Sequence, residues 1–340
     1  MCKLKQPISS AQGKVMRVRK LLLMPLLVVA AWVFLQAAQA QDWPQRPVKI
    51  IVPFAPGGNA DGMARIVALR FNEVFGQQFV VENRSGAGGA LGVEMVARAP
   101  ADGLTLLWGV QPQIAILPAM VKVPYDPVKD LAPISVLATN PFVLVVNGKL
   151  PVTTVAEFIA WAKAQPTKPS YASSALGSVA QLAMELLLKR AGVAMTAVHY
   201  RGNAPAMADV VAGHLPAMFS SLADALPQAS NGGVRLLAVS GDQRARQVPN
   251  VPTVAESGYP GYRVVTWNGL MAPAGTPKPI IDRLAAEMAR AAKDPKIAER
   301  LIAYGVDPLG NSPAEFADLI QAELRLWAEA VEIAGVKQQQ

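Results

Sequence analysis

The first part of the chain alternates short apolar runs, glycine-rich turns and segments with a helical period. Residues 48–52 form a β-branched apolar run that predicts a strand, and this run ends at the turn 53–59, which contains prolines and glycines. From residue 60 the apolar positions recur at helical spacing, so the turn opens directly onto a helix. A strand–turn–helix unit is therefore predicted here.

The same unit then repeats. Residues 79–81 predict a second strand, residues 83–89 a second glycine-rich turn, and the apolar positions from Leu91 onward a second helix. Each turn precedes a helix N-terminus, where several backbone N–H groups lack intrahelical partners and the helix dipole is positive. Two such starts side by side favour a site for a small anion, and glycine lets the backbone approach it closely.

Strands and helical segments continue to alternate, which predicts right-handed crossovers, a parallel sheet and ligands at the carboxyl ends of its strands. Capping-box sequences begin helices at Thr154 and at Ser312. The further strands are expected at 104–108, 134–137, 142–146, 170–172, 196–199, 217–219, 234–239 and 264–271, and further helices at 154–164, 179–190 and 204–211.

This pattern divides into two lobes. The dipeptide Asn140-Pro141 separates two apolar runs and marks a first crossing, and the proline- and glycine-rich stretch 249–261 indicates the return. We therefore expect an α/β protein in which residues 43–140 and 263–340 form one lobe and residues 141–262 form the other. Two lobes joined by two crossings enclose a cleft, which is the usual location of a small-molecule site.

Composition and charge narrow the class of protein. The chain has 340 residues and 52% hydrophobic content, enough to build two cores. Its formal charge is +8, but residues 1–40 carry six Lys and Arg and no acid, so subtracting these six leaves +2 for the rest. This balance argues against nucleic acid or an anionic membrane as the partner.

The six cations precede the apolar block 21–35, and Ala38-Gln39-Ala40 follows it, so residues 1–40 are expected to be a signal peptide cleaved after Ala40. Met16 would give a more usual start. Cys2 is the only cysteine and lies in this segment, which leaves the mature chain without disulfides or thiolate ligands. A large exported protein without disulfides suits the bacterial periplasm.

The residues that could carry out catalysis are few. The chain lacks a phosphate-loop Gly-Lys-Ser/Thr and a Gly-x-Ser-x-Gly elbow, and Leu91 stands where the dinucleotide fingerprint needs its third glycine. His199 and His214 are interpreted as structural, and no spacing suggests a metal site or cofactor. Asp61 at a helix start favours capping, with a possible ligand hydrogen bond. Trp267-Asn268 could line the cleft, although a buried tryptophan is the safer expectation.

Several motifs together resemble the Bug family, the periplasmic substrate-binding receptors of tripartite tricarboxylate transporters. The resemblance covers essentially the whole mature chain in the same order. Its motifs are Pro53-Phe54-Ala55-Pro56-Gly57-Gly58 with Asp61, Glu82 to Gly89, Ala99 to Leu106, Val251 to Glu256, and Pro273-Ala274-Gly275-Thr276-Pro277.

This resemblance implies a type II periplasmic binding protein whose lobes close on a small carboxylate held by main-chain groups of the glycine loops and by water. On this sequence the implied binding residues are Pro56, Gly57, Gly58, Asn59 and Asp61 in the first loop, Ala87 and Gly88 in the second, and Ser173, Ser178, Ala204 and Ser220 in the opposite lobe.

The chain also departs from the family pattern. Ala175 replaces a glycine and Gln181 a histidine, while Arg201 stands where lysine is common and Ser220 where many members have aspartate. A carboxylate at position 220 could pair with an ammonium group, so Ser220 argues against an amino-acid ligand.

The resulting hypothesis is a monomeric periplasmic receptor, not an enzyme, that binds a small organic carboxylate and delivers it to membrane permease subunits. No metal, cofactor or nucleic acid is expected. Two alternatives stay open: an extracytoplasmic sensor that presents its ligand to a signalling receptor, and an exported hydrolase that uses Asp61 and a serine.

Overall fold

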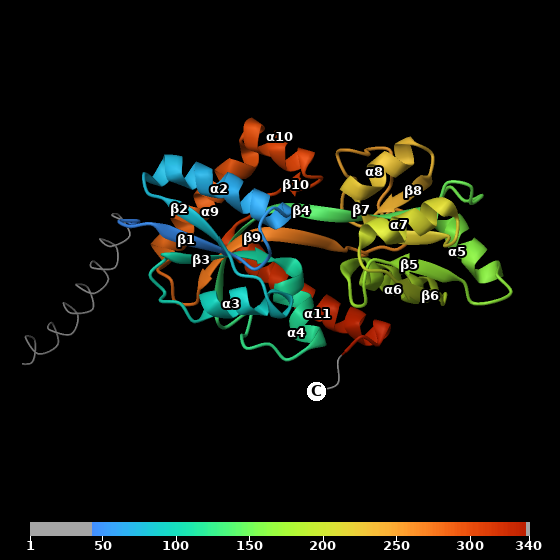
Figure 1. The fold of residues 1–340 in the computed structure, drawn as a ribbon, viewed down its shortest axis with the longest axis horizontal. Helices are drawn as coiled ribbons and strands as arrows, with labels where there is room; N and C mark the ends of the chain where they lie inside the picture. Colours follow the sequence, from blue (N-terminus) through green and yellow to red (C-terminus); the bar gives the residue numbers. More distant parts are fainter. Residues whose placement is uncertain (1–42, 338–340) are drawn as a thin grey trace, which may run out of the picture. The chain divides into compact units, whose positions relative to one another are not determined.

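One long strand organises the main sheet. The computed structural model describes residues 43–337, and in it β4 (Leu131–Asn147) pairs with β9 (Val265–Pro273) along its first part. Along its last part β4 pairs with β7 (Ala217–Ser221) and β8 (Val234–Val239). We call β1–β3, β9, β10 and the helices around them the first half, and β5–β8 with their helices the second half; β4 belongs to both (Figure 1).

The sheet of the first half is mixed. Its order is β10 (Asp307–Pro308), β4, β9, β3 (Thr105–Val110), β1 (Val48–Val52) and β2 (Phe79–Asn83). β1 is parallel to β2 and β3, as the sequence predicted, but β9 is antiparallel to β3 and to β4. The expectation of a parallel sheet is wrong beyond β1–β3, because β9 returns from the second half and enters between two strands that are consecutive along the chain.

The two strands expected at 134–137 and 142–146 are one strand. Pro141 does not end β4; it lies opposite Val265, the first residue of β9, and the next residue, Phe142, already pairs with Ser221 of β7. Proline has no N–H to donate to a ladder, so it is tolerated where one partner strand ends and the next begins. The interruption in the sequence pattern therefore marks a change of partner.

Helices cover both faces of the sheet in the first half. Figure 1 shows α2 (Asn59–Phe75) and α9 (Lys278–Lys293) on one side, and α3 (Ala90–Ala97) and α11 (Pro313–Ala334) on the other. Shorter helical segments complete this half: η1 (Ala87–Gly89), η2 (Pro112–Ile116), α4 (Leu117–Met120) and α10 (Pro295–Ala303). The expected capping box of α11 is confirmed, since Ser312 and Glu315 bond reciprocally.

The second half adds a separate parallel pair, β5 (Ser170–Ser173) and β6 (Thr196–His199), to the strands β7 and β8. Its helices are α5 (Val155–Ala164), α6 (Val179–Ala191), α7 (Asn203–Ala212) and α8 (Leu222–Ser230). The capping box expected at Thr154 is also confirmed. Helix starts with explicit capping residues were therefore predictable from the sequence.

The C-terminal helix contributes to two apolar cores. Phe316 and Ile320, near the start of α11, pack in the cluster that holds Trp267 of β9. Trp327 and Val331, about two to four turns later, pack in a second cluster that contains the apolar face of α6. The lobe boundaries given above remain a prediction. Whatever their exact position, α11 packs in the apolar cores of both halves.

The expected signal peptide, residues 1–40, lies outside the described residues. Between residues 43 and 337, no helix combines the length and the apolar character needed to cross a membrane.

Candidate functional site

The two glycine loops leave the sheet side by side. β1 and β2 are parallel and in register at their ends, with Val52 opposite Asn83, and the amide of Arg84 donates to the carbonyl of Val52 at 2.8 Å. The loops 53–58 and 84–89 therefore start from the same sheet edge. Each runs into a helical segment, α2 for the first loop and η1 with α3 for the second.

The first loop presents its backbone to solvent. Pro56, Gly57, Gly58 and Asn59 are all exposed. Gly58 is the N-cap of α2, and no side chain caps this helix. The first-turn N–H groups of α2 consequently have no side-chain acceptor, which is the condition under which a helix N-terminus binds an anion.

Asp61 fixes the first loop from behind. Its carboxylate is 4% exposed and accepts hydrogen bonds from the Gly57 amide, Arg65 Nε and Asn83 Nδ2, each at 3.0 Å. Asn83 Nδ2 also donates to the carbonyl of Phe54 at 3.1 Å. Asp61 thus ties the first loop to the end of β2, and the expectation that it caps α2 is wrong, because no side chain accepts from the first-turn amides of this helix.

The charge of Asp61 is well supported. Burial by itself would raise the pKa of this carboxyl, but the hydrogen bonds from Arg65, from the Gly57 amide and from Asn83 outweigh burial and hold the pKa below its ordinary value. Asp61 is therefore a carboxylate at neutral pH whose negative charge is matched by donors of the protein itself.

The second loop is a tight, left-handed segment. Ala87 is the one described non-glycine residue with positive φ, at 47°, and it lies between Gly86 and Gly88. Ala87 and Gly88 are exposed. Gln113 Nε2 donates to the carbonyl of Gly88 at 2.9 Å, and this hydrogen bond fixes the loop. Strained backbone of this kind persists where the surrounding structure fixes it, and it is common at ligand sites.

In the second half, Ser173 and Ser178 shape one turn. Ser173 ends β5 and is buried; its Oγ donates to the carbonyl of Ala175 at 2.9 Å and lies 3.4 Å from Ser178 Oγ. Ser178 caps α6, and the Gln181 side chain accepts from the amide of Gly177 at 2.7 Å. Gln181 therefore stabilises this turn.

Ser220 and Ala204 lie in neighbouring segments that Asn203 connects. Asn203 Nδ2 donates to Ser220 Oγ at 2.9 Å and to Asp224 Oδ2 at 2.8 Å, and Ser221 Oγ donates to the same Asp224 oxygen at 2.7 Å. Ser220 is fully buried, whereas Ala204, in the first turn of α7, is exposed. A carboxylate thus stands one helical turn beyond position 220.

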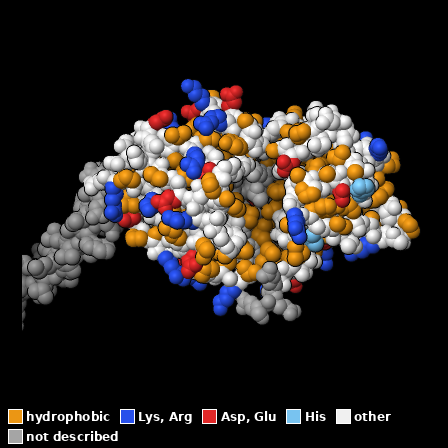
Figure 2. All heavy atoms as spheres, in the orientation of Figure 1, with side chains coloured by type: hydrophobic (Ala, Val, Ile, Leu, Met, Phe, Trp, Pro, Cys, Tyr) orange, Lys and Arg blue, Asp and Glu red, His pale blue; other side chains and the backbone are white. Residues whose placement is uncertain are grey.

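A segment missed by the sequence analysis links the two halves. A Cβ added to Gly62 in α2 would lie 2.5 Å from the hydroxyl oxygen of Tyr304, and one added to Gly305 would lie 2.9 Å from the Cβ of Ala223 in α8. Tyr304–Gly305 therefore contacts the first turns of both helices. Figure 2 shows this face of the molecule hollowed between the parts that carry α2 and α7 in Figure 1.

Trp267 and Asn268 lie inside the protein. Trp267 is fully buried, packs edge-on against Phe316, and donates from Nε1 to Glu323 at 2.8 Å. Asn268 is 3% exposed and lies 3.3 Å from Trp108 Nε1. The expectation of a buried tryptophan is confirmed.

Among the residues that matter to this site, Gln113, Asn203 and Asp224 were not found from the sequence. Ser221-x-x-Asp224 has the spacing of a helix cap, which could have drawn attention to Asp224. Gln113 gave no signal, because it meets the second loop from a different element.

These features define a class: a mixed α/β protein with two exposed glycine loops at adjacent strand ends. The family model described as "Tripartite tricarboxylate transporter family receptor" matches residues 63–336, and the chain belongs to this family. Its fold is that of the periplasmic binding proteins of this family.

Known relatives agree with this assignment. The protein BugT of Bordetella pertussis is 37% identical over 88% of this chain and 92% of its own length. The solved structure of Rpa4515 from R. palustris with adipate is 37% identical, with a TM-score of 0.69, and the match covers 86% of this chain and 98% of that one. MatC from Rhodopseudomonas palustris, solved with bound malate, is 33% identical, with a TM-score of 0.66 and coverage of 85% and 100%.

Proposed function

We propose that this protein is a periplasmic receptor that captures a small organic carboxylate and delivers it to the membrane permease of a tripartite tricarboxylate transporter. The observation that carries the proposal is the pair of exposed glycine loops, 53–58 and 84–89, at neighbouring ends of β1 and β2. Backbone N–H groups at helix starts favour a negatively charged partner. Membership in a receptor family supports the transport role.

The binding residues proposed are those of the two loops and of the facing turns. Gly58, Asn59, Ala87 and Gly88 would supply backbone N–H groups. Pro56 has no N–H, and the Gly57 amide already donates to Asp61. The proposed set is Pro56, Gly57, Gly58, Asn59, Asp61, Ala87 and Gly88 from the first half, and Ser173, Ser178, Ala204 and Ser220 from the second. Asp61 would act mainly by holding the first loop, since its oxygens already accept three hydrogen bonds.

The ligand class we propose is a dicarboxylate. Two of the similar solved proteins were obtained with adipate and malate, which share two carboxylate groups. Ser220 offers no charge for an ammonium group, and one oxygen of Asp224 is already shared by Asn203 and Ser221. One ligand carboxylate would lie at the glycine loops, and the other would face the turns of the second half.

Capture would involve closure of the two halves. A ligand that contacts both halves binds the closed form better and so shifts the open–closed equilibrium toward it. The two crossings, near Asn140 and in the segment 249–261, are where this motion would be accommodated. The closed form would be the one that the permease recognises.

Calorimetric titration with adipate, malate, glutamate and dimethyl adipate tests this proposal. Adipate and malate are expected to bind, whereas glutamate, which adds an ammonium group, and the uncharged diester are not. Small-angle scattering on the same samples should show a smaller radius of gyration at saturation. Binding of the diester as tightly as adipate, or an unchanged radius with bound adipate, would contradict carboxylate recognition or closure, respectively.

Asn59→Asp provides the site-directed version of this test. Aspartate is well tolerated in a first helical turn, but it places a carboxylate among the amides that would bind the ligand. We expect at least tenfold weaker adipate binding, about 1.4 kcal/mol, with an unchanged melting temperature. Asn231→Asp, an identical change at an exposed residue outside both crossings, should bind adipate normally.

A further inference from the structure

A second cavity lies beside β4, where this strand changes partner. Its volume is about 200 Å³, and its walls come from β4 at Thr139, from the loop 241–246, from the start of β9, and from β10 with the residues after it. None of the carboxylate-site residues proposed above lines it. The cavity is therefore a separate place on the molecule.

Charged side chains dominate the walls of this cavity. Arg244, Arg246 and Arg263 line it together with Asp242 and Asp307. Within the described part of the chain, these side chains differ in the hydrogen bonds and ion pairs that they already make. The groups with few such bonds are the ones available to a ligand.

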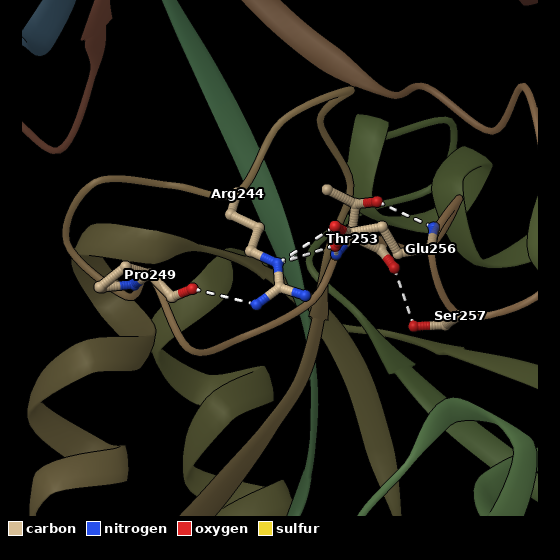
Figure 3. Close-up of polar contacts among 5 residues, drawn as sticks. All are labelled: Arg244, Pro249, Thr253, Glu256 and Ser257. Carbon is tan, nitrogen blue, oxygen red and sulfur yellow. Dashed lines mark hydrogen bonds and ion pairs between the residues drawn. The ribbon is translucent and has the colours of Figure 1, made fainter.

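Arg244 already uses its guanidinium in bonds to neighbouring residues of the protein. Its Nε lies 3.2 and 2.9 Å from the two Glu256 oxygens, and its Nη1 donates to the carbonyl of Pro249 at 3.3 Å (Figure 3). Glu256 is in turn fixed by Thr253, whose Oγ1 accepts from the Glu256 amide at 3.0 Å. The part of the return segment around Thr253 and Glu256 is thus held by hydrogen bonds.

Arg263 and Arg246 keep donors available. Arg263 has only wide ion pairs, 3.8 Å to Asp242 and 3.6 Å to Glu323, and Arg246 has no hydrogen bond or ion pair to any residue between 43 and 337. Each guanidinium carries five N–H donors in a fixed, planar arrangement that suits oxyanions. Two cations with spare donors therefore face one small cavity.

Asp307, unlike the two arginines, lacks a hydrogen-bond donor for one of its oxygens within residues 43–337. Its Oδ1 is buried and has no hydrogen-bond partner in the described structure. Burial raises the pKa of this carboxyl, and the positive charge of Arg246 only partly opposes the rise. An unsatisfied buried carboxylate oxygen is costly, so a donor brought into the cavity would be favourable.

We propose that this cavity binds a small oxyanion that still carries a proton, of which hydrogen phosphate is the simplest example. The unprotonated oxygens accept from Arg246 and Arg263, and the P–OH group donates to Asp307 Oδ1. Sulfate at neutral pH has no proton to donate, so its oxygen would face the Asp307 oxygen unfavourably. A bound ion connects the loop after β8 with β10, across the place where β4 changes partner.

Calorimetric titration of the whole protein with inorganic phosphate, at neutral pH and constant ionic strength in chloride, tests the site. Phosphate should bind saturably, and Arg246→Gln should weaken it at least tenfold, because a charge-assisted pair is lost. Arg98→Gln, at the exposed C-cap residue of α3, is the matched control and should bind phosphate normally. Absent binding, or equal binding to Arg246→Gln, would overturn the site.

Adipate titrations separate this site from the glycine loops. Arg246→Gln should bind adipate as the unmodified protein does, and saturating adipate should not displace phosphate. If adipate displaces phosphate and Arg246→Gln leaves phosphate binding unchanged, the ion occupies the glycine loops and the cavity proposal is wrong. Failure of adipate to bind would not affect the phosphate result.

The role of Asp307 is tested by sulfate. The unmodified protein should bind sulfate at least tenfold more weakly than phosphate, whereas Asp307→Asn, whose amide can donate, should bind the two about equally. Equal binding of both ions by the unmodified protein would overturn the role given to Asp307. If Asp307→Asn does not fold, the comparison on the unmodified protein decides alone. Binding of methylammonium in place of phosphate would also overturn the proposal.

Discussion

At the scale of single residues, the conformation of each glycine loop depends on side chains that hydrogen-bond to its backbone. Asp61 and Asn83 fix the first loop, and Gln113 fixes the second through the Gly88 carbonyl. These side chains use their polar atoms on the protein itself, as does the Gly57 amide, so the loops are fixed before any ligand binds. Such preorganisation lowers the ordering cost of binding.

Asp61→Asn should therefore destabilise the protein. The amide cannot keep the ion pair with Arg65, and hydrogen bonds to a charged acceptor contribute about 1.5–3 kcal/mol, so we expect a loss of about 2 kcal/mol in the free energy of unfolding at neutral pH. Urea unfolding measures this loss. Asp282→Asn, at an exposed carboxylate of α9, is the control and should change stability little.

The difference in the free energy of unfolding between the unmodified protein and Asp61→Asn should become smaller in acid. The folded-state pKa of Asp61 is lower than the value near 3.9 in an unfolded chain, so its carboxylate stabilises the fold above that value. This contribution is lost as the pH falls through the folded pKa. A stability difference that stays constant from neutral pH to well below 3.9 would contradict the assigned charge.

Among residues, sequence reasoning identified those whose role is local. Thr154 and Ser312 cap helix starts, where spacing along the chain determines the contact. Gln113 and Asn203 act on segments that only the fold brings near them, and periodicity contains no information about such contacts.

At the scale of elements, α3 sets the separation of the two glycine loops. A Cβ added to Gly92 would lie 2.8 Å from the carbonyl oxygen of Arg84 and 3.0 Å from the Cα of Pro53, both backbone atoms. The helix can pack this closely because Gly92 has no side chain. The loops on either side are consequently held against one helix.

Gly92→Ala should push α3 away from both loops. Overpacking of this kind typically costs about 1–3 kcal/mol, and we expect that loss of stability together with weaker carboxylate binding, measured by thermal melting and by adipate titration. Met95→Ala, on the exposed side of the same helix, should affect neither measurement appreciably. A Gly92→Ala protein with normal stability would show that α3 shifts freely.

Element types were predicted better than their pairing. Strand and helix periods are local, so most elements appear where the pattern placed them. The continuity of β4 through Pro141 and the insertion of β9 between β3 and β4 are decided by pairing across the chain. Hydrophobic pattern does not encode which strand becomes a neighbour.

At the scale of the whole molecule, Ser240 connects the two crossings. Its Oγ accepts from the Phe142 amide in β4 at 2.8 Å and donates to the carbonyl of Val264, just before β9. The backbone of Ser240 also bonds both residues. This fully buried serine therefore ties together the strands through which the halves are joined.

Ser240→Ala should weaken that connection. It leaves the buried Phe142 amide without its side-chain acceptor, which typically costs about 1–3 kcal/mol, and urea unfolding should show a loss of that size. Ser230→Ala removes an exposed serine in α8 and should be nearly neutral. Equal stabilities of the two variants would mean that the crossings are held by backbone bonds alone.

The helix α11 has a consequence for how the two cores depend on each other. Phe316 and Ile320 complete one core, and Trp327 and Val331 complete the other. A chain in which α11 is not docked therefore lacks part of both cores, so loosening this one helix would expose apolar surface in each half at the same time.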